Sequence, residues 1–178
     1  MDFIKTSDVL KDVKIFKGKF FPDERGYFKK PFFGDNLESD FQNISEVLVS
    51  KSRKNVIRGI HFQTPPSDVS KLISCIDGVV KDVFIDLRKD SPTYGTFDYV
   101  YLDNVDNFSV IIPEGFGHGF SVLSESATVV YLQSGPFDDN HDSGINSLDL
   151  EIDWEVEDPI LSEKDKSLIS FSKFQSPW

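Results

Sequence analysis

The chain has 178 residues, of which 39% are hydrophobic, which is enough for one domain with a sizeable core. Its formal net charge of −11 gives no support to a nucleic-acid-binding surface. A single cysteine, Cys75, excludes an intrachain disulfide and a cysteine-cluster zinc site. Residues 1–18 lack the apolar core of a signal peptide, and no apolar run is long enough to cross a membrane. We therefore expect a soluble, cytoplasmic protein.

The N-terminal part of the chain is rich in aromatic residues. Strands are expected at 13–21 and 26–33, joined by a turn at 22–26, and residues 34–43 have the composition of a short helix. Exposed aromatic side chains are costly in water, so this aromatic arm is expected to pack either on its own sheet or on a second copy of the chain. Its aromatic residues are Phe16, Phe20, Phe21, Tyr27, Phe28, Phe32 and Phe33.

The middle of the chain is a series of short strands with almost no helical periodicity. This pattern predicts an all-β fold, either an antiparallel sandwich or a jelly roll. No repeat or linker interrupts it, so residues 1–178 are expected to form a single domain. After Gly135 the pattern weakens into a loop-rich, partly helical segment, in which Ser162 is the expected cap of a helix. The expected strands are 44–52, 56–63, 71–77, 79–88, 97–103, 107–112, 119–123 and 127–133.

Three cationic or titratable residues fall on apolar strand sequence. Arg58 and His61 lie within VIRGIHFQ, and Lys71 opens the next strand after a Pro-rich loop. Burying a charge is costly unless something anionic meets it. The guanidinium of Arg58 suits a phosphate or sugar oxygen, and an internal salt bridge is the alternative. The stretch from 56 to 88 therefore indicates a binding site.

A set of motifs runs through almost the whole chain in a fixed order. They are DERGYF at 23–28, VIRGIHFQ at 56–63, KLISCIDGVVKDVFIDLRKDSPTYG at 71–95, IIPEGFGHGFSVLSE at 111–125, Tyr131, DSGI at 142–145, IDW at 152–154 and PILSEKD at 159–165. In sequence and spacing they resemble the dTDP-4-dehydrorhamnose 3,5-epimerases, the RmlC-type cupins. The resemblance implies a cupin-type antiparallel jelly roll and a homodimer whose N-terminal strands reach the partner subunit. It further implies a nucleotide-diphosphate sugar substrate, no cofactor, and a role in deoxysugar biosynthesis for surface polysaccharide.

Inverting the carbons beside a 4-keto group needs a base, an acid on the opposite face, and a cation at the developing oxyanion. Histidine has an ordinary pKa of about 6.5, so His61 is the candidate base. The resemblance pairs it with Asp165, places Lys71 near the C4 oxygen and makes Tyr131 the acid at C5. Each has a structural alternative: a satisfied strand histidine, a helix-capping carboxylate, a solvated lysine and an amphipathic strand aromatic.

The resemblance also implies a set of substrate-binding residues. His118 lies in GFGHGF, where glycines let the backbone approach a ligand or simply make a turn. His61, His118 and His141 are far apart in sequence and form no His-x-His pair, so no metal site is expected. The implied substrate-binding residues are Arg25, Arg58, His118, Lys30, Glu46, Lys164 and Asp142.

Four departures from the family pattern fall where the nucleotide or substrate is contacted. Lys30 replaces a glutamate, residues 46–48 (Glu-Val-Leu) replace Gln-x-Asn, residues 136–137 (Pro-Phe) replace two tyrosines, and residues 147–149 (Ser-Leu-Asp) replace Trp-Asn-Asp. Because the replaced side chains offer different hydrogen-bonding groups, we expect them to pair with the edge of a different nucleotide base. One hypothesis is a GDP- or CDP-linked substrate or an altered sugar, such as a heptose. The other is a dTDP enzyme whose contacts have moved.

Three functions compete on these residues. The leading one is an isomerase that inverts C3, C5 or both. A sugar-nucleotide 3,4-ketoisomerase would use similar histidine chemistry without exchange at C5, and the presence of Tyr131 argues against it. A non-catalytic binding protein would be expected to lack part of the set formed by His61, Asp165 and Lys71.

Overall fold

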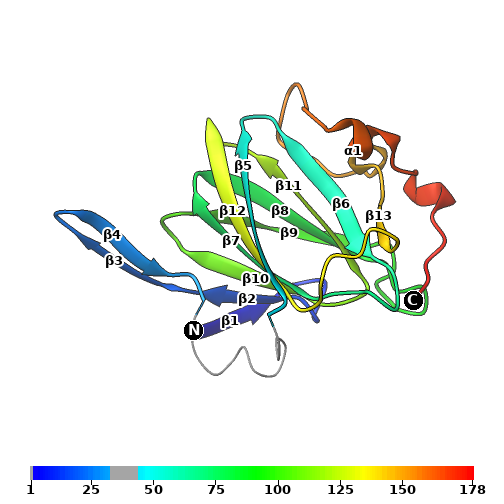
Figure 1. Cartoon of the computed structure of the whole chain (residues 1–178), viewed down its shortest axis with the longest axis horizontal. Coiled ribbons are helices and arrows are strands. Elements are labelled where there is room, and N and C mark those ends of the chain that lie inside the picture. The colour runs from blue at the N-terminus through cyan, green and yellow to red at the C-terminus, as the bar shows by residue number, and fades with distance from the viewer. Residues whose placement is uncertain (1, 33–43) are drawn as a thin grey trace.

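The fold of the protein is a jelly roll of two facing antiparallel sheets (Figure 1). The computed structural model describes residues 2–32 and 44–178. The six-stranded sheet has the order β1 (Asp2–Thr6), β2 (Lys14–Lys17), β10 (Phe108–Ile112), β7 (Lys71–Asp77), β12 (Ser126–Gln133) and β5 (Glu46–Arg53). The five-stranded sheet has the order β13 (Asp142–Gly144), β6 (Ile57–Gln63), β11 (Phe116–Val122), β8 (Val79–Asp86) and β9 (Phe97–Asp103). The predicted all-β class is confirmed.

Most of the expected strands form within a few residues of their expected bounds. The strand expected at 13–21 is broken at Gly18, where the backbone N–H donates to the Asn107 carbonyl at 2.8 Å. A Cβ at Gly18 would lie 2.3 Å from the Asn107 side chain, so the chain can turn from one sheet to the next only with glycine there. The strands β1 and β13 were not expected from the sequence. The helix expected at 34–43, and Phe33, lie outside the described residues.

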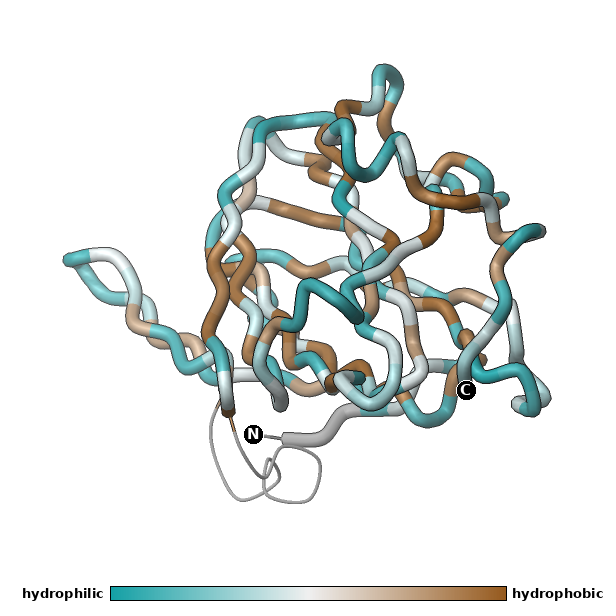
Figure 2. The backbone as a smooth tube through the Cα atoms, turned by 45° about the vertical axis from the view of Figure 1, so that its right-hand side comes forward, coloured by the Kyte–Doolittle hydropathy of each residue, from teal (hydrophilic) through white to brown (hydrophobic). Residues whose placement is uncertain are grey.

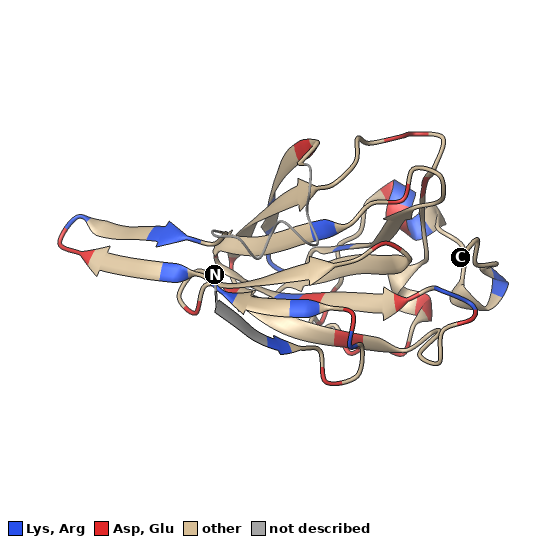
Figure 3. Ribbon diagram, turned by 90° about the horizontal axis from the view of Figure 1, so that it is seen from below, with Lys and Arg blue, Asp and Glu red and all other residues tan. Residues whose placement is uncertain are grey.

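After the break at Gly18 the chain forms a separate hairpin, β3 (Lys19–Asp23) and β4 (Gly26–Lys30), which projects away from the two sheets (Figure 1). Lysines lie at the base of both of its strands and Arg25 lies in its turn (Figure 3). Phe21, Tyr27 and Phe28 are 48%, 48% and 58% exposed, whereas Phe16, before the break, is buried in the chain's own core. The exposed part of the aromatic arm is therefore this hairpin, whereas Phe16 before it and Phe32 after it pack on the chain's own core.

Two large apolar layers and a smaller cluster around Phe16 and Leu72 hold the jelly roll together. Hydrophobic segments run through the body of the molecule (Figure 2). Between the sheets, Ile73 and Val129 from one sheet pack with Phe84 and Phe120 from the other. On the outer face of the five-stranded sheet, residues such as Ile85 are covered by the segment after residue 145, including Trp154. Each such side chain contributes about 1.5–3 kcal/mol when it is buried. The loop-rich C-terminal segment is thus an integral layer of the fold.

The C-terminal segment contains three short helices, which are the 3-10 helices η2 (Ser147–Asp149) and η3 (Phe171–Lys173) and the helix α1 (Glu163–Ser167). The expected cap of α1 is confirmed, because Ser162 Oγ accepts the backbone N–H of Asp165 at 3.0 Å. The cap fixes the first turn, so Asp165 is buried and faces β6. No helix in residues 2–32 and 44–178 is long and apolar enough to cross a membrane.

A β-bulge in β6 decides which side chains share a face. In a regular strand, residues three apart lie on opposite faces. Opposite β11, however, His61 pairs with His118 and Arg58 pairs with Phe120, so three residues of β6 span two of β11. Gly59 at the bulge has φ +109°, and a Cβ there would lie 2.5 Å from the His118 carbonyl. The bulge turns both Arg58 and His61 toward the space between the sheets.

Candidate active site

A pocket of about 340 Å³ opens between the sheets at one end of the jelly roll. Along β7 the inward side chains change from Cys75 and Ile73, which are fully buried, to Lys71 at the strand's first residue. The apolar core therefore becomes polar at this end. The pocket is lined by Leu48, Val49, Ser50, Arg58, His61, Phe62, Gln63, Lys71, His118, Phe120, Tyr131, Gln133, Phe137, Asp142 and Lys164.

His61 and Asp165 form a hydrogen-bonded pair at the pocket wall. Nε2 of His61 lies 2.6 Å from Oδ1 of Asp165, although 104 residues separate them in sequence. The Asp165 side chain is 5% exposed and the His61 side chain is 32% exposed, so the imidazole faces the pocket and the carboxylate lies behind it. Burial alone would raise the pKa of Asp165, but hydrogen bonds from His61 and Ser162 outweigh it and lower that pKa. An ionised Asp165 holds the imidazole of His61 in one orientation.

A second pair lies deeper, where Nε2 of His118 is 2.8 Å from Oδ2 of Asp82. Asp82 is fully buried, and its Oδ1 has no hydrogen-bond partner among the described residues. Burial raises the pKa of Asp82, and attraction to His118 and Lys71 opposes this shift. Lys71 Nζ donates to the His61 carbonyl at 3.4 Å. Burial lowers the pKa of Lys71 to about 8, against attraction to Asp142 and Asp82. The pocket therefore holds a cation beside two histidine–carboxylate pairs.

Tyr131 lies on β12, where its ring packs edge-on against His118 with the ring centroids 6.0 Å apart. Its hydroxyl is 3.3 Å from Ser50 Oγ on the neighbouring strand β5. Burial raises the pKa of Tyr131, while Ser50 and the charge of Arg58 act in the opposite direction. A buried phenol with a hydroxyl partner stays protonated and can donate.

Arg58 lines the pocket from β6, in the sheet opposite the one that carries Tyr131. Its Nε donates to Ser52 Oγ at 2.9 Å, and it forms no ion pair within the described parts of the chain. The alternative of an internal salt bridge therefore finds no support in residues 2–32 and 44–178. The rest of the guanidinium fork is available to an anionic ligand, which is the chemistry that arginine serves best.

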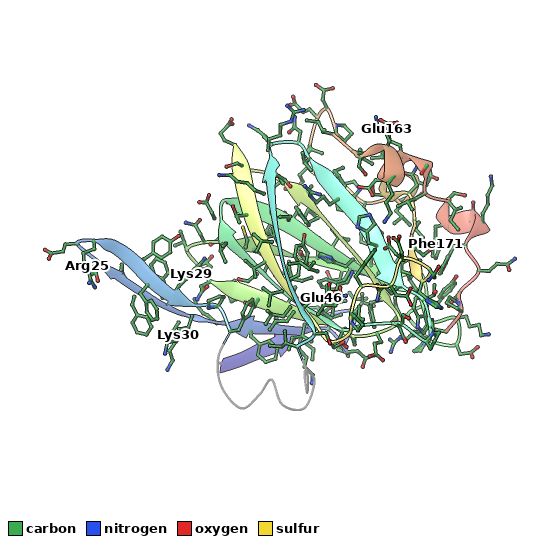
Figure 4. The ribbon with its side chains drawn as sticks, viewed as in Figure 1. Arg25, Lys29, Lys30, Glu46, Glu163 and Phe171 are labelled. Atoms are coloured by element: carbon green, nitrogen blue, oxygen red, sulfur yellow. The ribbon has the colours of Figure 1, made fainter. Side chains whose placement is uncertain are left out.

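The remaining residues implied by the resemblance divide into two groups. Asp142 and Lys164 line the pocket and form an ion pair at its rim. Glu46 lies at the end of β5, where its Oε1 accepts the backbone N–H of Phe137 at 2.9 Å. Arg25 and Lys30 lie on the hairpin, away from the pocket of their own chain (Figure 4). Arg25 pairs with Asp23 at 2.6 Å, and Lys30 Nζ lies 5.9 Å from the centre of the Phe28 ring.

Sequence reasoning missed, among others, Asp82, which pairs with His118, and the lining residues Ser50 and Gln63. Asp82 is a carboxylate within the apolar strand VVKDVFID, and the argument applied to Arg58 would also have singled it out. Ser50 and Gln63 carry no comparable signal, because a serine or a glutamine on a strand is ordinary. Among the described residues, no group of three His, Cys, Asp or Glu side chains is arranged to hold a metal ion.

A jelly roll with a polar pocket between its sheets defines a cupin, and paired histidines, a lysine and a tyrosine give the pocket the groups of an acid–base enzyme. The family model described as dTDP-4-dehydrorhamnose 3,5-epimerase matches residues 7–173. The chain belongs to this family of epimerases.

Relatives of known name agree with this assignment. The chain is 40% identical over 170 residues to the dTDP-4-dehydrorhamnose 3,5-epimerase of Shigella flexneri, covering 93% of each chain. It is 41% identical over 152 residues to the dTDP-4-dehydrorhamnose 3-epimerase of Streptomyces niveus, covering 83% of this chain and 73% of that one. These two relatives are almost equally similar to the chain, yet one is named for inversion at C3 and C5 and the other for inversion at C3.

Solved structures show the same fold. An epimerase from Legionella pneumophila in complex with dTDP-4-keto-L-rhamnose matches with a TM-score of 0.89 at 31% identity, covering 98% of this chain and 95% of that one. A 4-keto-6-deoxy sugar epimerase from the novobiocin gene cluster of Streptomyces spheroides matches with a TM-score of 0.90 at 32% identity, covering 97% and 89%.

Proposed function

We propose that the protein inverts C3, C5 or both in a nucleotide-linked 4-keto-6-deoxy sugar, without a cofactor. The observation that carries the proposal is the pocket itself, which gathers His61, Lys71 and Tyr131 around one cavity. These are a base, a cation and an acid, the groups that proton transfer beside a carbonyl requires. The names of the relatives from Shigella flexneri and Streptomyces niveus, both built on dTDP-4-dehydrorhamnose, support the substrate class.

The proposed first step is removal of a proton from carbon by His61. Because Nε2 of His61 is held by Asp165, Nδ1 carries the lone pair that accepts the proton. The imidazolium that forms is stabilised by the ionised Asp165 behind it. The electrons of the broken C–H bond move into an enolate, whose negative charge falls on the C4 oxygen. Lys71 is the cation proposed to stabilise that oxygen.

The second step returns a proton to the opposite face of the enolate. Tyr131 is the proposed donor, with Ser50 and Arg58 stabilising the tyrosinate that remains. Nδ1 of His118 is proposed to accept a hydrogen bond from a sugar hydroxyl, since His118 lines the pocket and Asp82 holds its Nε2. Arg58, Lys164 and Asp142 are proposed to contact the diphosphate and the sugar hydroxyls.

We also propose that the protein is a homodimer in which the hairpin completes the partner's pocket. Arg25 lies at the exposed turn of the hairpin with its side chain 85% exposed, and the aromatic side chains beside it are exposed as well. A second copy of the chain would cover those rings, and the Arg25 cation would then reach the diphosphate in the pocket of that second copy. We propose the cytoplasm as the location, because a single buried cysteine suits a reducing compartment.

The test is solvent exchange with a panel of 4-keto-6-deoxy sugars linked to dTDP, GDP and CDP, incubated in D2O and read by NMR. Deuterium at C3, at C5 or at both supports the proposal and identifies the nucleotide. The dTDP sugar comes first because of the relatives' names. The GDP and CDP arms are needed because Leu48 lines the pocket without a hydrogen-bonding group and Glu46 is already bonded to Phe137. The absence of exchange at C5 with every sugar, together with carbonyl migration to C3, would identify a ketoisomerase.

A further inference from the structure

The side chain of Gln63 joins two loops at the rim of the pocket. Gln63 ends β6, two residues after His61, lines the pocket and is only 5% exposed. Its amide nitrogen donates to the Ser67 carbonyl at 2.6 Å and to the Pro136 carbonyl at 3.2 Å. Its amide oxygen accepts the backbone N–H of Asp138 at 2.7 Å. All three partners are backbone groups of loops 64–70 and 134–141, so one amide fixes two segments that are about 70 residues apart.

Asp138 provides a second connection between the same loops. Its Oδ2 accepts a hydrogen bond from Ser67 Oγ at 2.7 Å and lies 2.8 Å from Nδ1 of His141. These hydrogen bonds, with one from the Asn140 backbone, lower the pKa of Asp138 to about 2. The carboxylate is therefore ionised at neutral pH, and the connection persists there.

Loop 134–141 forms one wall of the pocket. It carries Phe137, which lines the pocket while 51% exposed, and it leads directly into Asp142 of β13. The loop is held to β5 by the hydrogen bond from Phe137 to Glu46, and its continuation is held to α1 by the ion pair of Asp142 with Lys164. These two contacts lie at the exposed rim. The buried contact of the loop with the strand that bears the base is made by Gln63.

We propose that Gln63 is a positioning residue for ligand binding, which holds the wall formed by Phe137 and Asp142 in the shape that receives the nucleotide-diphosphate sugar. Gln63 makes no hydrogen bond to His61, Lys71 or Tyr131 within the described parts of the chain. Its loss therefore changes how well the ligand is bound and leaves proton transfer in the bound complex intact. The inference rests on the proposed function only for the identity of the ligand.

Gln63→Glu is the sharpest test, because the two side chains have the same shape. A carboxylate still accepts from the Asp138 N–H, but it has no donor for the Ser67 and Pro136 carbonyls and repels both. Gln175→Glu is the matched control, since it makes the same change of charge at an exposed position of the C-terminal segment. Asp138→Asn weakens the same connection from the other loop and serves as a second variant if Gln63→Glu does not fold.

Two measurements decide the proposal. The first is calorimetric binding of dTDP, GDP and CDP without turnover, and the second is the split of kcat from KM in the exchange assay. We expect Gln63→Glu to weaken binding of the preferred diphosphate and to raise KM by ~10-fold, with kcat within ~3-fold of wild type and Gln175→Glu unchanged. Asp138→Asn should shift KM in the same direction by a smaller factor. A fall in kcat with unchanged KM and binding, or no change in any of them, would overturn the inference.

Failure of the proposed function looks different from failure of this inference. If the wild type binds a diphosphate but exchanges no proton, the proposed reaction is wrong and the binding arm still tests Gln63. If the wild type exchanges protons and Gln63→Glu binds and turns over normally, only the role of Gln63 is wrong.

Discussion

The pocket and the β3–β4 hairpin show opposite ways of placing charge. In the pocket, each histidine meets a buried carboxylate from the same chain, at 2.6 Å for His61 and 2.8 Å for His118. On the hairpin, Arg25 pairs with Asp23, two residues away, and both side chains are exposed. The aromatic side chains follow the same division, because Phe120 is buried beside the pocket while Phe28 is 58% exposed. The pocket thus keeps its charges beside partners from distant parts of the chain, whereas the hairpin leaves Arg25 and Phe28 exposed.

The largest expected effect comes from removing the proposed base. His61→Asn should lower the rate of deuterium exchange at C3 and C5 by about 10²–10⁴-fold, the usual contribution of a general base. The matched control is His141→Asn, because His141 also pairs with a carboxylate, Asp138, at 2.8 Å. The control should keep kcat within ~3-fold, and both variants should melt close to wild type. Equal losses in the two variants would contradict the assignment.

Measuring the oligomeric state tests whether the β3–β4 hairpin forms the proposed dimer interface. Phe28→Asp should weaken the dimer by at least ~30-fold, because truncating an aromatic anchor at an interface costs about 2 kcal/mol or more. Sedimentation velocity over a range of concentrations measures the change. Val105→Asp is the control, since Val105 is 65% exposed between β9 and β10, and its variant should remain dimeric. A wild type that is monomeric at all concentrations would refute the proposed dimer.

A finer test concerns the acid side of the pocket. Ser50→Ala removes the hydroxyl 3.3 Å from Tyr131, one of two groups that oppose the effect of burial on the phenol's pKa. In an enzyme that inverts both carbons, exchange at C5 should fall by ~10-fold relative to C3, since Tyr131 is proposed to act at C5. Ser50→Thr keeps a hydroxyl and should restore the ratio. An equal fall at both carbons would instead indicate a general loss of packing.

The smallest expected effect is a pH dependence. Burial lowers the pKa of Lys71 to about 8, so the cation proposed for the oxyanion is present below pH 8 and is lost as the pH rises through that value. The value of kcat/KM should therefore halve near pH 8 and continue to fall above it. Lys71→Arg keeps its charge at these pH values, so its profile should stay flat there even if its rate is lower. A wild-type profile that is flat to pH 10 would remove Lys71 from this role.

Some features of the fold and the site follow from local sequence. Short β-rich segments predicted most strands, because alternation and turn residues act over a few positions. Ser162 was identified as a helix cap because capping involves residues only three apart. The same reasoning failed at β13, where the three residues 142–144 pair with β6 but carry no strand pattern of their own. The cationic residues on strand sequence indicated a site because a buried charge is costly wherever the strand lies, although Arg58 itself is exposed at the pocket.

The sequence by itself determined the all-β class, the family and the residue types of the pocket. Only the tertiary structure decided how they meet. Period-two alternation would separate Arg58 from His61, and it is the bulge at Gly59 against β11 that turns both inward. His61 meets Asp165 across 104 residues only because the C-terminal layer packs on the outer face of the five-stranded sheet. Such contacts depend on how whole sheets pack, and no local pattern encodes that.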